Sequence, residues 1–183
     1  MRKSLILLGI LDDSDIEWTI RAGAKLRVAP GEKIIREGEP LGSIYIVLDG
    51  SFNVSVGNEK NVIAKLYAGD ILGEMSFVDS RPPSATVTAA KESWVLDIPR
   101  PEVRLRMEEE PGFAGRFYRA LAVFLTTRLR ETVSHLGYGK AVVDDKDELD
   151  ESGQLPDDLL DNMALAGKRF NMLQGRTRSV ASA

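Results

Sequence analysis

The sequence contains no cysteine and a single histidine among its 183 residues. Without cysteine there can be no disulfide, no thiol nucleophile and no cysteine-ligated metal. Metal centres and acid–base dyads built on histidine need partner groups, and no cluster of them lies near His135 in the sequence. There is also no Gly-x-Ser-x-Gly nucleophile elbow. We therefore expect no catalytic residue, no metal site and no required cofactor, and we interpret His135 as a helix C-terminal residue favoured by the helix dipole.

Long apolar runs and an excess of basic residues are also missing. The apolar run at residues 5–11 is too short to span a bilayer, and Asp12 and Asp13 follow it without a small-residue cleavage site. Residues 1–142 have equal numbers of basic and acidic residues, so the net charge of −4 comes from residues 143–183. A nucleic-acid-binding domain usually has a basic face. These absences predict a cytoplasmic protein with neither a membrane nor DNA as a direct partner.

Short strands separated by turn signals dominate the middle of the chain. Glycine and proline divide it at closely spaced points, among them Asp49-Gly50, which is a strong hairpin signal. Within 51–56 apolar and polar residues alternate, so one face of that strand is buried. Short strands of this kind are typical of a sandwich, a jelly roll or a barrel. The expected strands are 24–28, 33–36, 43–48, 51–56, 61–67, 71–72, 84–89 and 94–98.

Helices are predicted on both sides of these strands. Acidic and serine caps at 12–15 begin one helix, which should end near Gly23. Another follows at 102–109, and an apolar stripe with three- and four-residue spacing extends the helical pattern over 113–135. Two interpretations of that stripe remain open: packing against the strands, or a seam between two copies of the chain.

The C-terminal part divides into an acidic linker at 140–156 and an amphipathic helix with a tail at 157–183, after a main domain at 1–139. The apolar face of this last helix is broad, which favours docking onto its own domain over binding a partner. Residues 176–183 are expected to be a frayed end.

One segment, residues 67–89, has features of a ligand site. A helical turn over 74–79 and the loop at Ser84 and Ala85 offer backbone N–H groups to an anion. Gly73 allows a ligand to approach the backbone closely. The Glu74 carboxylate can accept a hydrogen bond from a sugar hydroxyl, and Ser84 can donate one to a phosphate oxygen.

This segment resembles the phosphate-binding cassette of the cyclic nucleotide-binding domain family. The family pattern is Gly-Glu-apolar-small-apolar-apolar, a short loop, and then Pro-Arg-small-Ala-Thr-Val, and it is matched at 73–78, at Pro82 and at 84–87. The resemblance covers about residues 8–136. It implies a mainly β fold, an eight-stranded β-roll (jelly-roll-like) with an N-terminal helix and C-terminal helices. The candidate ligand-binding residues are Gly73, Glu74, Met75, Arg81, Ser84, Ala85 and Thr86.

The sequence departs from the family pattern at one position, because Pro83 stands where the family has the arginine that pairs with the cyclic phosphate. Proline has neither a side-chain donor nor an N–H. A charged hydrogen bond contributes about 1.5–3 kcal/mol, which corresponds to one or two decades of affinity. Arg81 is a candidate replacement; the alternative is that it is a solvated loop residue.

Two functions follow from this resemblance. The first is a non-catalytic regulatory module that binds cyclic AMP or cyclic GMP and signals through its C-terminal helices, to a protein partner or within a homodimer. The alternative is a degenerate domain that no longer binds nucleotide and acts as a protein–protein interaction module. Only 44 residues follow Gly139, too few for the helix-turn-helix domain that direct DNA reading would require. Base selectivity should come from the long helix, where Thr126, Thr127 and Arg128 are candidates.

Overall fold

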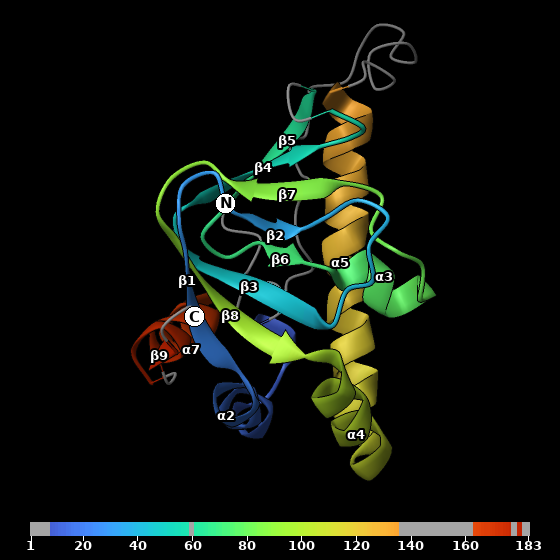
Figure 1. Cartoon of the computed structure of the whole chain (residues 1–183). Coiled ribbons are helices and arrows are strands. Elements are labelled where there is room, and N and C mark those ends of the chain that lie inside the picture. The colour runs from blue at the N-terminus through green and yellow to red at the C-terminus, as the bar shows by residue number, and fades with distance from the viewer. Residues whose placement is uncertain (1–7, 59–60, 136–162, 177–178, 181–183) are drawn as a thin grey trace, which may run out of the picture.

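A computed structural model of the chain describes residues 8–58, 61–135, 163–176 and 179–180 (Figure 1). Two sheets form its framework. The first has five strands in the order β6-β3-β8-β1-β9, and the second has four in the order β2-β7-β4-β5. The strands are β1 (Ala24–Val28), β2 (Lys33–Ile35), β3 (Ser43–Asp49), β4 (Ser51–Ser55), β5 (Val62–Tyr67), β6 (Ile71–Leu72), β7 (Thr86–Ala89), β8 (Ser93–Pro99) and β9 (Ser179–Val180).

The predicted eight-stranded β-roll is confirmed, with strand ends that agree to within about two residues. All pairings among β1–β8 are antiparallel. The expectation of a frayed C-terminus is wrong for residues 179–180, which pair in parallel with Lys25 and Leu26 of β1 as strand β9. The outer edge of β1 presents backbone N–H and C=O groups, and a chain segment passing beside it can satisfy them.

The five-stranded sheet has an apolar layer on each face. Along β3, Ile44, Ile46 and Leu48 belong to a core shared with the helices, whereas Val47 between them belongs to the core enclosed by the two sheets. This is the burial expected for alternating side chains of a strand covered on both faces. The apolar interior of the roll is therefore a separate layer from the core under the helices.

Five helices of six or more residues are arranged around the sheets in the described part of the chain (Figure 1). The first begins with a capping box between Asp12 and Asp15, as its sequence predicts. The longest runs alongside the strands and has the short helix of the 67–89 segment at its side. They are α2 (Asp13–Ala22), α3 (Glu74–Asp79), α4 (Arg100–Glu109), α5 (Pro111–His135) and α7 (Met163–Arg176).

The apolar stripe of α5 is divided between core and solvent. Its first turns belong to the core, because Phe113, Phe117 and Phe124 are buried between the helices and the five-stranded sheet. Farther along, Leu129 is 63 % exposed and Val133 is 41 % exposed. Core packing is thus confirmed for the first part of the helix, and the seam between two copies stays a prediction for the last part.

Helix α7 packs against α2 and the helical core. Phe170 and Leu173 are buried there, and the buried guanidinium of Arg169 donates from Nη1 to the carbonyls of Leu8 and Leu11, at 2.7 Å each. The preference for docking over a free helix is confirmed for the described residues. The expected linker at 140–156 and the expected start of the helix at 157 lie outside them, and the three-part domain division stays a prediction.

Candidate functional site

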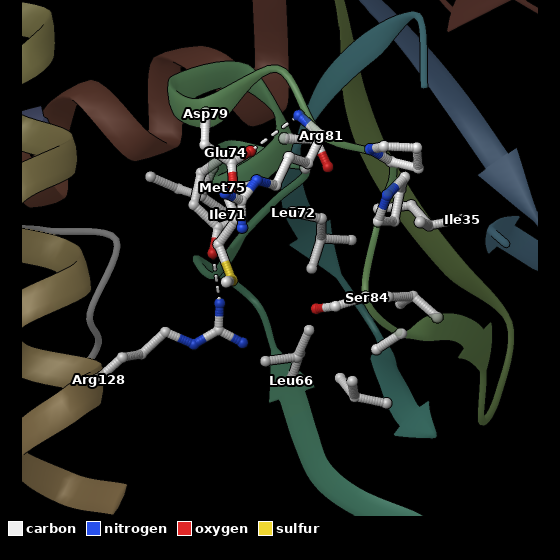
Figure 2. Close-up of a pocket in the computed structure, with 17 residues that line it drawn as sticks. Ile35, Leu66, Ile71, Leu72, Glu74, Met75, Asp79, Arg81, Ser84 and Arg128 are labelled. Atoms are coloured by element: carbon white, nitrogen blue, oxygen red, sulfur yellow. Dashed lines mark hydrogen bonds and ion pairs between the residues drawn. The ribbon is translucent and has the colours of Figure 1, made fainter. Parts of the chain in front are cut away.

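A cavity of about 270 Å³ lies between the four-stranded sheet and α3, with α5 along one side (Figure 2). Its floor is apolar and includes Leu66 and Leu72, whereas its rim has polar groups from Glu74, Ser84 and Arg128. An apolar cavity with a few convergent polar groups is the usual form of a small-molecule site, although this one is near the lower end of the size range, about 300 Å³.

Six of the seven candidate residues chosen from the sequence line this cavity. They come from two neighbouring segments, the start of α3 and the loop that connects α3 to β7. The seventh, Thr86, is not among the lining residues, and its hydroxyl oxygen accepts the backbone N–H of Glu37 at 3.1 Å. The six lining residues are Gly73, Glu74, Met75, Arg81, Ser84 and Ala85.

Gly73 occupies a backbone position that only glycine adopts easily. It is the N-cap of α3 with φ of 81°, in the left-handed region. A Cβ atom here would lie 2.6 Å from Cδ2 of Leu41 and 3.0 Å from the carbonyl oxygen of Ser43. The glycine therefore lets α3 begin directly against the first residues of β3, which brings the cavity wall close to the sheet.

Arg100, a residue that the sequence analysis did not single out, holds α3 in place. Its Nη1 donates to the carbonyl of Leu41 at 2.8 Å and its Nη2 to the carbonyl of Ser76 at 2.6 Å. Its guanidinium also lies over the ring of Phe77, a buried residue of α3. No local motif marks Arg100, because both partners are carbonyls brought to it by tertiary packing.

Glu74 is buried, with only 3 % of the residue exposed, and is paired with a cation from α5. Its Oε1 accepts a hydrogen bond from Nη1 of Arg128 at 2.7 Å. Burial raises the pKa of Glu74 above its usual value, the nearby charge of Asp70 adds to the rise, and Arg128 opposes it. The pair joins two elements that are 54 residues apart in sequence.

The raised pKa of Glu74 gives a prediction about stability. The folded protein retains this proton at a pH where the unfolded chain, with a carboxyl pKa near 4.5, has lost it. The free energy of unfolding therefore falls as pH rises from about 4.5 to the raised pKa, and is constant above it. Glu74→Gln is expected to remove that slope, as measured by urea unfolding across pH. Glu39→Gln, on an exposed side chain, is the control that keeps it, and equal slopes in both variants would contradict the prediction.

In the loop from Arg81 to Ala85, Pro83 stands at the position of the family arginine. Pro83 lines the cavity with its ring, and its carbonyl accepts the backbone N–H of Gly38 at 2.9 Å. The Arg81 side chain is 84 % exposed, and its Nε lies 4.0 Å from Oδ2 of Asp79. Arg81 thus reaches the cavity rim but is mostly in water.

Of the three residues considered for base selectivity on α5, one reaches the cavity. Arg128 is among the lining residues, whereas Thr126 and Thr127 are not. The Thr127 hydroxyl donates to the carbonyl of Val123 on its own helix, at 2.9 Å. The sequence placed Arg128 on the right helix, but its register against Glu74 depends on how α5 packs.

Comparison with known proteins agrees with this geometry. Residues 25–110 match the family described as "Cyclic nucleotide-binding domain". Those residues belong to that family. The fold is also that of a cyclic nucleotide-binding domain from Methylobacillus flagellatus, with a TM-score of 0.66 and 22 % identity, over 78 % of this chain and 85 % of that one.

Curated relatives include regulatory proteins. The chain is 40 % identical over 71 residues to a cAMP-dependent protein kinase regulatory subunit of Yarrowia lipolytica, which covers 39 % of this chain and 19 % of the relative. It is 28 % identical over 123 residues to an uncharacterized NTE family protein of Mycobacterium tuberculosis, or 67 % of this chain and 21 % of the relative. The chain thus spans about a fifth of the length of these relatives. The family match and the kinase regulatory subunit together support a regulatory nucleotide-binding module.

In the described part of the chain, none of the helices has the length and apolar character that a membrane span needs. Nor do three or more histidine, aspartate or glutamate side chains of those residues gather into a group that could hold a metal ion.

Proposed function

We propose that this cyclic nucleotide-binding domain is a non-catalytic, cytoplasmic regulatory module that binds cyclic AMP or cyclic GMP in the cavity beside α3. The observation that supports this most is that six residues selected from the family motif line one cavity. Gly73 and Glu74 would face the ribose, and Ser84 and Ala85 the phosphate. The apolar floor would bury the remainder of the ligand.

The signal would leave through the C-terminal helices. Arg128 is at once part of the cavity lining and part of α5, so a ligand in the cavity contacts the helix directly. Beyond that contact, the exposed side chains of Leu129 and Val133 offer an apolar surface to a protein partner or to a second copy of the chain. DNA and membranes are not expected partners.

The alternative function rests on Pro83. If the absent arginine has removed nucleotide binding, the domain would act as a protein–protein interaction module through the same exposed surface of α5. The two functions differ in whether the cavity binds nucleotide at all, which a direct titration measures.

The experiment is calorimetric titration of the full chain with cyclic AMP, cyclic GMP and a cyclic dinucleotide. We expect micromolar binding of cyclic AMP or cyclic GMP, weakened about tenfold by Gly73→Ala, because the added Cβ would collide with Leu41 and displace the start of α3 from the cavity wall. Gly42→Ala is the matched control, since a Cβ there meets nothing within 4 Å. Absence of heat at millimolar ligand from a folded sample would favour the interaction module.

A further inference from the structure

The cavity contains a cation that does not come from the motif loop. Among the described residues, the cavity lining has two positively charged side chains, Arg81 and Arg128. A cyclic nucleotide has one negative charge on its phosphate, and Pro83 cannot pair with it. The question is which of the two arginines takes that role.

Arg81 is poorly placed for this role. With 84 % of its side chain in water, an ion pair at this position is worth little, because solvent screens it and the long side chain loses freedom on pairing. Its nearest anion is Asp79, two residues earlier in the same exposed loop, which competes for it. Its backbone N–H is also taken by Oδ1 of Asp79, at 3.0 Å.

Arg128 is held in position from two sides. Its side chain is only 26 % exposed, and its guanidinium lies 5.5 Å from the ring centre of Phe124, which is fully buried. Figure 2 shows the side chain extending from α5 toward Glu74, with Ser84 across the cavity from it. A guanidinium carries five N–H donors in a planar fork, and the hydrogen bond to Glu74 uses one of them.

We propose that Arg128 is the phosphate-binding cation of this domain, and that Glu74 is its positioning residue. This inference rests on the proposed function. Nη1 stays on Glu74 while the other donors of the fork bind the phosphate, so the buried carboxylate is never left without a cation. Arg128 then acts on the sugar–phosphate side of the ligand, not on its base.

One consequence concerns signalling. In the family pattern the phosphate arginine belongs to the same loop as the small residue that follows it, whereas the cation proposed here belongs to α5. Binding of the ligand's charge would therefore clamp α5 against α3 and the loop at Ser84. Slower hydrogen exchange in the segment 122–130 on ligand addition is expected, and it should be absent in a variant without the Arg128 guanidinium.

The test compares cyclic AMP affinity across matched variants by calorimetry, with circular dichroism and thermal melting to confirm folding. Arg128→Gln is expected to weaken binding by about 10–100-fold, the range for a charged hydrogen bond. The affinity of Arg128→Lys should lie between those of the parent and Arg128→Gln, because lysine keeps the charge but lacks the planar set of N–H donors of a guanidinium. Arg130→Ala is the control: it removes an exposed arginine two residues along the same helix and should leave affinity unchanged.

Rescue separates a direct contact from a structural effect. Adding Pro83→Arg to Arg128→Gln restores a cation at the family position and is expected to recover most of the lost affinity. If Arg128→Gln binds like the parent while Arg81→Ala loses affinity, the inference is overturned and the proposed function stands. If the parent itself binds neither cyclic AMP nor cyclic GMP at millimolar concentration, both are overturned.

Discussion

Arg116→Ala is expected to lower the free energy of unfolding by about 3–5 kcal/mol. The Asp15 side chain of α2 has no exposed surface, and Arg116 of α5 binds it through two hydrogen bonds, from Nε to Oδ2 at 2.6 Å and from Nη2 to Oδ1 at 2.8 Å. Removing the arginine leaves a buried carboxylate without a cation, which is far more costly than losing a surface pair. The pKa of Arg116 is raised chiefly by its hydrogen bond to Asp15, as expected for this pairing.

Thermal and urea unfolding of the full chain measure this effect. For a chain of this length the loss corresponds to a fall in Tm of about 6–20 °C. The matched control is Arg27→Ala, which breaks an ion pair with Glu92 in which both side chains are more than half exposed, and it should leave Tm unchanged. The double variant Arg116→Ala with Asp15→Asn should recover part of the loss, because the buried charge is gone. Equal effects of Arg116→Ala and Arg27→Ala would contradict the interpretation.

Leu173→Ala is expected to cost about 2–5 kcal/mol. Leu173 is fully buried in the core shared by α7, α2 and the five-stranded sheet, so its truncation leaves a cavity. Neighbouring polar contacts hold α7 in place and prevent the site from collapsing. The Gln174 amide donates to the carbonyl of Leu48 at 2.6 Å, and the buried Arg169 binds the carbonyls of Leu8 and Leu11.

The control on the same helix is Leu165→Ala, because Leu165 is 38 % exposed. Its truncation should have a much smaller effect on the urea midpoint than that of Leu173. The comparison also tests the role of α7. If the two substitutions are equally mild, α7 does not stabilise the domain, and the hypothesis that it is a partner-binding helix regains support.

Most of the β-roll could be predicted from local sequence features. Glycine and proline turns separate the strands, and the alternation in 51–56 agrees with the burial of Phe52 and Val54 in β4. These features act over a few residues, so they can be recognised without knowing what packs against them. The two-residue strand β9 has no such feature, because it exists only where docking of α7 brings the chain beside the open edge of β1.

The ligand site was predictable to the same extent. The six candidate residues from Gly73 to Ala85 are local in sequence, and the structure brings all six to one cavity. The seventh candidate, Thr86, does not line the cavity. Side chains alternate along β7, and the Thr86 hydroxyl oxygen accepts the backbone N–H of Glu37 instead. The end of the apolar stripe on α5 was not predictable either, since its spacing continues to Val133 although that side chain is 41 % exposed.

The sequence by itself determined the fold class, the strand order along the chain and the segment that forms the cavity, since turns, alternation and the motif are all properties of neighbouring residues. Only the tertiary structure decided which α5 side chain lines the cavity, what covers the edge of β1 and where α5 leaves the core. Glu74 and Arg128 meet across 54 residues, and Arg169 meets Leu8 across 161. Such contacts depend on the packing register of whole helices, which no local pattern encodes.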